Sequence, residues 1–259
     1  MTPRSLAPEA LNEAEAVAEL AALATAIAHH DALYHHQDAP EISDADYDVL
    51  VRRNRAIEAR FPHLIRDDSP SHRVGAETVR GFLADKHLEP MLSLDNIFNI
   101  EQFQNFCTKI DKFLMKNSNE QIEFVGEPKI DGLSINLLYR RGKLVHCITR
   151  GDGYSGEDVT NNVITLRDVP RKLEGPFPEK VEVRGEIFME KKSFEDLNYT
   201  RIKNGEKPFA NPRNAAAGSV RQIDPGITKE RKLRFFAYAR GFSSEPIADT
   251  HWQYLNVLR

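Results

Sequence analysis

The sequence predicts an α+β fold, in which a small helical domain precedes a larger domain built on antiparallel sheets. Helical apolar spacing fills the front of the chain, and short β-branched runs bounded by turn residues dominate the rest. Strands that follow one another in runs favour antiparallel pairing, whereas a doubly wound sheet needs a helix after each strand. With 259 residues, of which 41% are hydrophobic, the chain can bury a substantial core.

The helical front consists of two predicted helices. Residues 10–36 carry Ala, Leu and Val at helical spacing without an internal Pro or Gly. Ser43 then opens a second helix that stops near Phe61. We predict a capping box there, in which the Ser43 hydroxyl accepts a backbone N–H and the Asp46 carboxylate reaches back to the start of the helix.

A boundary between two domains is expected in the segment 66–90, because Pro, Gly and Ser interrupt a stretch of mixed polarity. We predict a linker there with little regular structure. The chain is therefore divided into a helical domain at 1–70 and a second domain at 71–259. A further helix is predicted at 99–116, with Asn99 as its cap and one apolar face.

Five strands are predicted beyond that helix from short runs rich in β-branched residues. Arg141 and Gly142 are expected to join two of them as a hairpin. The predicted strands are 122–130, 133–139, 144–149, 181–188 and 233–242.

Charge is uneven along the chain, although the net charge is only -4. Residues 1–60 hold five basic and eleven acidic side chains, whereas residues 201–240 hold ten basic and three acidic ones. The small net charge argues against a protein that binds nucleic acid over its whole surface, because such binding needs clustered Lys and Arg. From charge alone, two differently solvated surfaces explain the asymmetry equally well.

No stretch approaches the roughly 18 apolar residues that span a bilayer, and the N-terminus lacks the pattern of a signal peptide. We therefore expect a cytoplasmic protein without a membrane partner. Cys107 and Cys147 are too few and too far apart for a zinc cluster. We predict no metal-ligating side chains, and we interpret four histidines near the front of the chain as surface residues: His29, His30, His36 and His63. His35 is excepted because it belongs to the motif Tyr34-His35.

The first chemical signal is the sequence from Glu127 to Gly132, which contains K-x-D-G. A strand period of two would place Glu127, Lys129 and Asp131 on one face. A lysine amine attacks only when it is neutral, and neighbouring carboxylates disfavour that form. A nucleophilic Lys129 therefore needs extra positive charge nearby, from a metal ion or from arginines. The K-x-D-G pattern alone is unspecific.

Three further motifs follow it in order: Thr149-Arg150-Gly151-Asp152-Gly153, Val183-Arg184-Gly185-Glu186 and Asn211-Pro212-Arg213-Asn214-Ala215-Ala216-Ala217-Gly218-Ser219. With these motifs the sequence resembles, essentially end to end, the bacterial NAD-dependent DNA ligases, which are covalent nucleotidyltransferases. The resemblance implies a nucleotidyltransferase domain of the ATP-grasp-like ligase type. It also implies that the front segment, with Tyr34-His35 and Asp44-Ala45-Asp46-Tyr47-Asp48, caps the nicotinamide half of NAD.

The resemblance implies that Lys129 attacks the α-phosphate of NAD and releases nicotinamide mononucleotide. Asp131 would orient this nucleophile, and Arg150 would contact the phosphate and supply the positive charge that the lysine needs. Arg213 and Arg221 would contact phosphates of adenylate or DNA. The residues implied to bind NAD are Tyr34, His35, Asp44, Ala45, Asp46, Tyr47, Asp48, Ser93, Leu94, Glu127, Arg150, Glu186 and Tyr238.

Local explanations remain open for part of that set. Ordinary helix-start charge and packing also account for the pattern from Asp44 to Asp48. Tyr238, which the resemblance places in a stack on adenine, could instead be a core residue. Gly151 and Gly153 could close a turn after the hairpin or could cradle a phosphate.

Members of this family continue beyond the position of Arg259, so we expect the chain to end inside the nucleotidyltransferase domain. Zinc is expected only in a later module of the parent protein. The implied reaction consumes NAD with Mg²⁺, passes AMP to a 5′-phosphate at a nick in duplex DNA, and seals the nick with the 3′-hydroxyl. We expect a monomer. Two alternatives remain: a catalytically inactive NAD-binding fragment, and an ATP-using relative.

Overall fold

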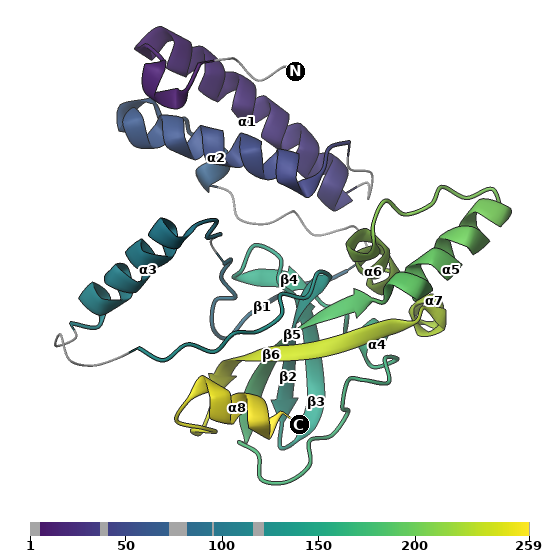
Figure 1. Cartoon of the computed structure of the whole chain (residues 1–259). Coiled ribbons are helices and arrows are strands. Elements are labelled where there is room, and N and C mark those ends of the chain that lie inside the picture. The colour runs from purple at the N-terminus through teal and green to yellow at the C-terminus, as the bar shows by residue number, and fades with distance from the viewer. Residues whose placement is uncertain (1–5, 37–40, 73–81, 95, 116–121, 259) are drawn as a thin grey trace.

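The computed structural model describes residues 6–36, 41–72, 82–94, 96–115 and 122–258. A pair of helices stands beside a larger domain in which helices cover one face of an antiparallel sheet (Figure 1). The predicted α+β class is therefore confirmed. No helix in the described ranges is long and apolar enough to cross a bilayer.

The helical pair consists of α1 (Glu13–His36) and α2 (Asp44–Arg60), as the sequence predicts. Ile57 is completely buried between them, within a small apolar core of their own. An ion pair between Arg53 Nε and Glu19 Oε1, 2.5 Å long and largely buried, also joins the two helices. Three short 3-10 helices flank the pair: η1 (Pro8–Ala10), η2 (Pro62–Leu64) and η3 (Pro70–His72).

The start of α2 confirms one half of the predicted capping box. Ser43 Oγ accepts a hydrogen bond from the Asp46 backbone N–H at 3.1 Å. The other half is wrong, because the Asp46 carboxylate accepts the Ser43 hydroxyl proton at 2.6 Å instead of reaching back to a backbone N–H. A hydroxyl and a carboxylate this close satisfy each other first.

The segment predicted as an irregular linker contains more structure than expected. Strand β1 (Ala84–Lys86) pairs antiparallel with β4 (Ser155–Glu157). The hydroxyl groups of Ser69 and Ser71 donate to the buried carboxylate of Glu58, which anchors the beginning of the segment to α2. Residues 73–81 lie outside the described residues.

The main sheet has the strand order β3-β2-β5-β6, and every neighbouring pair is antiparallel. Arg141 and Gly142 form the predicted hairpin turn, with φ values of 48° and 71°. Four of the five predicted strands are confirmed: β2 (Leu133–Arg140), β3 (Lys143–Thr149), β5 (Lys180–Met189) and β6 (Leu233–Ser243).

The fifth prediction, a strand at 122–130, is wrong, because the described residues 122–132 form no strand. Pro128 has no N–H to contribute to a ladder, and most side chains of this segment are exposed. The inference that Glu127, Lys129 and Asp131 share one strand face is therefore wrong as well.

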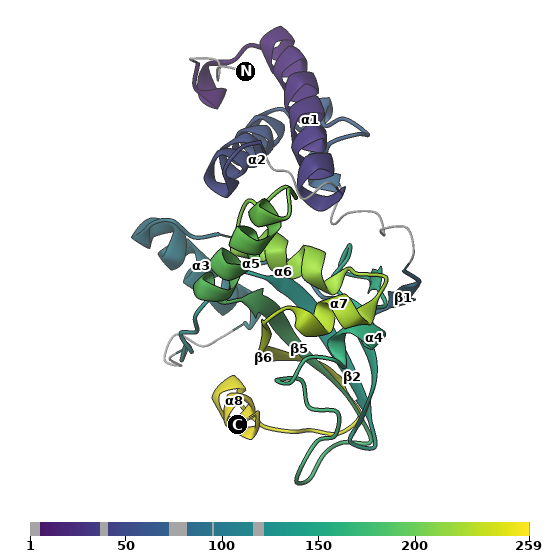
Figure 2. The same ribbon diagram turned by 90° about the vertical axis from the view of Figure 1, so that its right-hand side faces the viewer.

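Helices cover the apolar face of the sheet, and the core lies between the two layers (Figure 2). The sequence analysis did not predict these helices, which are α4 (Thr160–Val163), α5 (Lys191–Lys203), α6 (Pro212–Val220) and α7 (Pro225–Glu230). Helix α8 (His251–Val257) packs on β6, where the Tyr254 hydroxyl donates to the Ala239 carbonyl oxygen at 3.2 Å. Helix α3 (Ile100–Phe113) begins at the predicted cap, because Asn99 accepts from the Gln102 N–H at 2.9 Å.

Candidate active site

The central strands have one apolar face and one polar face, because successive side chains of a strand alternate. On the apolar face, Ile135 and Ile187 are completely buried in the core. On the other face, register places Ser134 opposite Glu186. The polar row of β2 and β5 consists of Ser134, Asn136, Glu182, Arg184 and Glu186.

Glu186 lies at the centre of the candidate site. The Ser134 hydroxyl donates to Glu186 Oε2 at 2.8 Å. Burial raises the pKa of Glu186, whereas the Ser134 hydrogen bond, the positive charges of Arg213 and Lys129, and the Gly132 N–H lower it. Two cations that the sequence places far apart therefore act on one buried carboxyl.

Arg213 reaches this place from the first turn of α6. Asn211 caps that helix by accepting from the Asn214 N–H at 2.8 Å, and Pro212 occupies the first turn. Arg213 Nη1 then lies 3.5 Å from Asp131 Oδ1. A guanidinium group is thus held two residues from Lys129, which is the kind of positive charge that a nucleophilic lysine needs.

Tyr238 and Arg150 lie on the same polar face. Burial raises the pKa of Tyr238, and the negative charge of Glu186 adds to this effect. The charges of Arg150 and Arg184 act in the opposite direction, so both guanidinium groups are near the phenol. The Arg150 guanidinium makes no ion pair with any residue that the structure describes.

The turn after β3 is closed by its glycines. Gly151 and Gly153 have φ values of 55° and 92°, a region that side chains rarely adopt. A Cβ on Gly151 would lie 1.9 Å from the Ser155 carbonyl oxygen. The Asp152 carboxylate accepts the N–H groups of Tyr154 and Ser155, and these bonds lower the pKa of Asp152. The turn therefore needs its glycines whether or not a phosphate is bound.

Two predicted site residues are bonded to side chains outside this cluster. Glu127 Oε1 lies 2.6 Å from His251 Nε2 of α8. Arg221 Nε donates to the buried Glu157 carboxylate at 2.7 Å. The predicted contacts of Glu127 with NAD and of Arg221 with phosphate therefore stay predictions.

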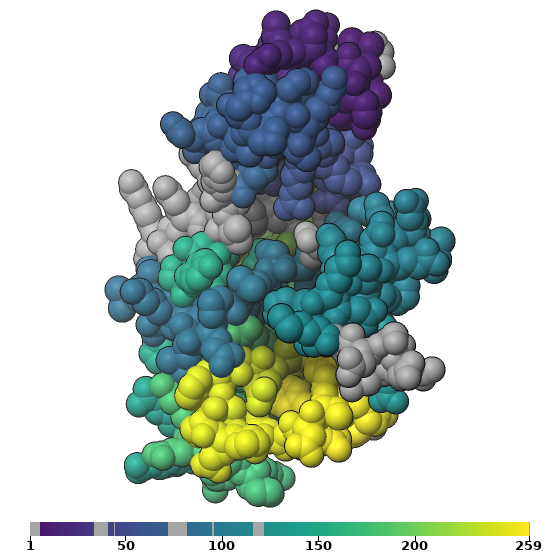
Figure 3. All heavy atoms as spheres, turned by 90° about the vertical axis from the view of Figure 1, so that its left-hand side faces the viewer, coloured from purple at the N-terminus to yellow at the C-terminus, as the bar shows by residue number. Residues whose placement is uncertain are grey.

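Met91 anchors the segment 91–94, whereas the side chains that follow Met91 are exposed. The Met91 N–H donates to the Gly153 carbonyl oxygen at 2.7 Å, and the Met91 side chain is buried. Ser93 and Leu94, the residues predicted to border the nucleotide, are exposed. Figure 3 shows this segment in blue beside the teal segment that leads into β2, with green atoms deeper between the two.

The front helices contact that same segment. The Tyr47 hydroxyl donates to Asp31 Oδ1 at 2.7 Å, and burial raises the pKa of Tyr47. Asp48 Oδ2 accepts from Asn96 Nδ2 at 3.4 Å. Helix α2 therefore lies next to residues that directly follow Leu94.

The structure shows few side-chain contacts for the remaining residues of the predicted nicotinamide cap. Ala45 and Asp46 are exposed on the first turn of α2. The side chains of Tyr34, His35 and Asp44 lie outside the part of the chain that the structure describes.

One group of possible metal donors occurs among the described residues. His29, His30 and Glu41 bring one donor atom each within 4.8 Å of one another. His29 Nε2 and Glu41 Oε2 are 3.0 Å apart, and both side chains are more than half exposed. A surface ion pair between an imidazole and a carboxylate accounts for that distance.

Sequence reasoning missed Ser134, Glu182 and Arg184. The signal was present, because V-E-V-R-G-E alternates apolar and polar residues up to Glu186. Extending the strand period backward from Glu186 places Arg184 and Glu182 on its face.

Two family models match this chain. Residues 80–259 match the family model of the NAD-dependent DNA ligase adenylation domain, and residues 13–75 match that of the DNA ligase-like, N-terminal NAD+-binding domain.

Several curated proteins named DNA ligase are similar to this chain. The chain is 57% identical to that of Hyphomonas neptunium over 246 residues, which are 95% of this chain and 35% of the relative. It is 54% identical to that of Gluconacetobacter diazotrophicus over 254 residues, which are 97% of this chain and 36% of the relative. The chain thus spans about a third of the length of these relatives. It belongs to the NAD-dependent DNA ligase family.

Proposed function

We propose that this chain carries out the first step of DNA ligation, in which the enzyme becomes adenylated at Lys129 with NAD as the donor. The observation that carries the proposal is the convergence of Lys129 and Arg213 on the buried Glu186 carboxyl, with Asp131 paired to the same arginine. This cluster combines a candidate nucleophile with cations that can stabilise phosphate charge.

In the proposed reaction, the neutral Lys129 amine attacks the α-phosphorus of NAD. A nitrogen–phosphorus bond forms, and the bond between that phosphorus and the bridging oxygen breaks. Nicotinamide mononucleotide leaves with the electron pair, and the Lys129 nitrogen releases one proton to water. Arg150 and Arg213 stabilise the negative charge on the phosphoryl oxygens, and Tyr238 stacks on the adenine. Glu186 binds the ribose.

We propose that NAD reacts together with Mg²⁺, which prefers oxygen ligands and keeps several waters. Asp131 pairs with Arg213, and Glu127 Oε1 lies 2.6 Å from His251 Nε2, so we assign neither carboxylate as a ligand. The phosphate oxygens of NAD would hold the ion instead. The ion would supply positive charge at the α-phosphate when it is bound.

For the whole protein we propose the complete reaction, with nicked duplex DNA as the partner. AMP passes from Lys129 to the 5′-phosphate, and attack by the 3′-hydroxyl then seals the nick. We propose that residues 1–70 form the domain that caps nicotinamide, through Tyr34, His35 and the segment from Asp44 to Asp48, and that residues 71–259 belong to the adenylation domain. A monomer in the cytoplasm is the proposed state.

The direct test is the intact mass of the purified chain before and after incubation with NAD and Mg²⁺. A single adenylate addition is expected, and it should be absent from Lys129→Ala and from an incubation with ATP. Addition with ATP would identify an ATP-using relative. Binding of NAD without any addition would show that the chain is a cofactor-recognition module.

A further inference from the structure

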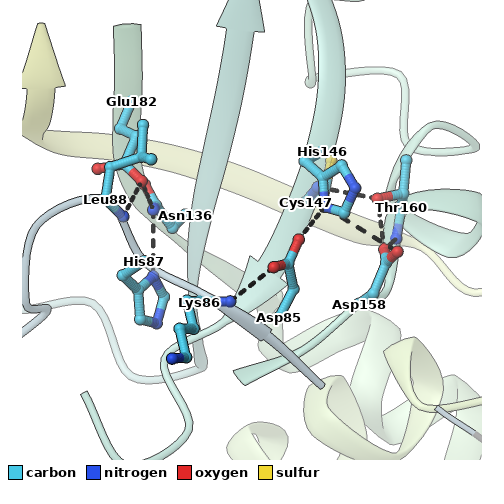
Figure 4. Close-up of polar contacts among 10 residues, drawn as sticks. All are labelled: Asp85, Lys86, His87, Leu88, Asn136, His146, Cys147, Asp158, Thr160 and Glu182. Atoms are coloured by element: carbon cyan, nitrogen blue, oxygen red, sulfur yellow. Dashed lines mark hydrogen bonds and ion pairs between the residues drawn. The ribbon is translucent and has the colours of Figure 1, made fainter. Parts of the chain in front are cut away.

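A chain of buried polar groups links β5 to the turn that carries Arg150. Glu182 is 1% exposed, and its carboxylate accepts from Asn136 Nδ2 at 2.7 Å and from the Leu88 N–H at 3.0 Å. Asn136 Nδ2 lies 3.1 Å from His87 Nδ1. His87 Nε2 lies 3.0 Å from the Arg150 carbonyl oxygen. Figure 4 shows the first part of this chain, from Glu182 through Asn136 to His87.

The direction of each hydrogen bond follows from its ends. Glu182 Oε1 already acts as the acceptor of the Leu88 N–H, so the group that Asn136 turns toward this oxygen is its NH₂. Flipping the amide would place an oxygen 2.7 Å from the carboxylate oxygen. The second proton of that NH₂ then points to His87 Nδ1, which must accept.

The hydrogen bond at the other ring nitrogen, Nε2, requires the same tautomer. A carbonyl oxygen only accepts, so His87 Nε2 must carry the proton that it donates to Arg150. The buried carboxylate of Glu182 therefore fixes a neutral, Nε2-protonated His87 through Asn136. A hydrogen-bond partner at one ring nitrogen of a histidine commonly determines whether the other ring nitrogen donates or accepts.

The Arg150 main chain is held from several sides by these contacts. Its carbonyl oxygen accepts from both His87 Nε2 and the Gly153 N–H, and its N–H donates to the Ser134 carbonyl oxygen at 3.1 Å. Ser134 is also the residue whose hydroxyl donates to Glu186. This backbone fixes the point from which the Arg150 side chain starts, and the charge of that side chain acts on Tyr238.

We infer that His87 is a positioning residue for the adenylation step, which acts by holding the Arg150 backbone so that the guanidinium meets the phosphate of NAD. Asn136 and Glu182 fix the tautomer that this role needs. The inference rests on the proposed function, in which Arg150 contacts phosphate.

Two substitutions of similar size separate the two ring nitrogens. In His87→Gln the side-chain NH₂ can occupy the place of Nε2 and still donate to Arg150. In His87→Asn the amide reaches only the place of Nδ1, so the bond to Arg150 is lost. We expect His87→Asn to weaken NAD binding by about 5-fold, the scale of one lost hydrogen bond, and His87→Gln to retain most of the affinity. Equal losses in both variants would overturn the inference.

A double-variant cycle measured by calorimetry with NAD tests whether the effect passes through Arg150. In an Arg150→Ala background, His87→Asn should change the NAD dissociation constant by less than about 2-fold, because coupled residues are not additive. A repeated 5-fold loss would refute the coupling. Asp85→Asn is the matched control, because Asp85 lies two residues away and pairs with His146 rather than with this chain of bonds (Figure 4). Its NAD affinity should equal that of the unchanged protein.

A measurement without NAD separates this inference from the proposed function. Nitrogen-15 spectra of labelled histidine at neutral pH should show His87 as the Nε2-protonated tautomer, and Asn136→Ala should abolish that preference. A Nδ1-protonated or fully protonated His87 would overturn the inference. Failure of the unchanged chain to bind NAD would instead refute the proposed function, while the spectra still decide the state of His87.

Discussion

Arg221 offers the sharpest test of whether a predicted phosphate contact is instead a structural residue. Its guanidinium donates to Glu157 at 2.7 Å, and the two side chains are 18% and 4% exposed. We expect Arg221→Met to destabilise the fold, because it removes the guanidinium that pairs with the buried Glu157 carboxylate.

The magnitude follows from that burial. Removing one partner of a buried ion pair costs about 3–5 kcal/mol. We expect the lower end, about 3 kcal/mol, because Arg221 keeps some access to water and Glu157 stays within 3.4 Å of the Thr149 hydroxyl. For a domain of this size each kcal/mol lowers Tm by roughly 2–4 °C, so the expected shift is roughly 6–12 °C.

Thermal unfolding followed by circular dichroism gives the shift. Lys232→Ala is the control, because Lys232 is 71% exposed and its pair with Asp196 should add little to stability. The double variant Glu157→Gln with Arg221→Met should recover part of the lost Tm, since the side chain at position 157 then carries no charge. If Arg221→Met melts within about 2 °C of the unchanged protein but binds nicked DNA poorly, the phosphate contact is correct and the structural role is wrong.

Three further predictions concern single groups. Burial raises the pKa of Glu186, so ionisation of this carboxyl destabilises the fold. Glu186→Gln should therefore raise Tm at neutral pH while lowering adenylation. The Tm difference should shrink as pH falls through the raised pKa, and this decrease should be complete near the ordinary glutamate pKa of ~4.3. Burial also raises the pKa of the Cys147 thiol, which makes this thiol unreactive. Under native conditions a thiol reagent should therefore modify Cys107 alone, and prompt reaction of both thiols would contradict the buried position of Cys147. Tyr47→Phe removes the hydroxyl that donates to Asp31. It should lower the stability of the helical pair by about 1 kcal/mol, and it should also lower the rate of adenylation by NAD. An unchanged rate with a lowered stability would remove Tyr47 from the proposed cap.

Local signals allowed the sequence to predict the helix starts and the hairpin. Ser43 and Asn99 accept N–H groups three residues onward, so their partners lie within the same few residues of sequence. The turn at Arg141 and Gly142 likewise needs only the conformations that those two residues adopt.

Partners that are distant in sequence explain what the sequence could not predict. Strand β1 pairs with β4 about 70 residues later, and its three exposed residues show no alternation. The segment before Gly132 has β-branched residues typical of a strand but forms no ladder, because a strand exists only where a partner offers its edge. The role of Arg221 is implied by the family resemblance, whereas its ion pair with Glu157 depends on the packing of α6.

The assembly of the site explains why its motifs must occur in a particular order and spacing. A Cβ on Gly132 would lie 2.2 Å from the Ile187 carbonyl oxygen, so only glycine lets the chain after Lys129 pass directly against β5. Antiparallel register then sets Ser134 opposite Glu186. Because Lys129 precedes Gly132 by three residues, the register that pairs β2 with β5 also brings the amine near the Glu186 carboxyl. The lysine motif and the glutamate motif are therefore brought together by one pair of strands. Changing the number of residues between Lys129 and Ser134 would separate Lys129 from Glu186, even if both side chains were kept.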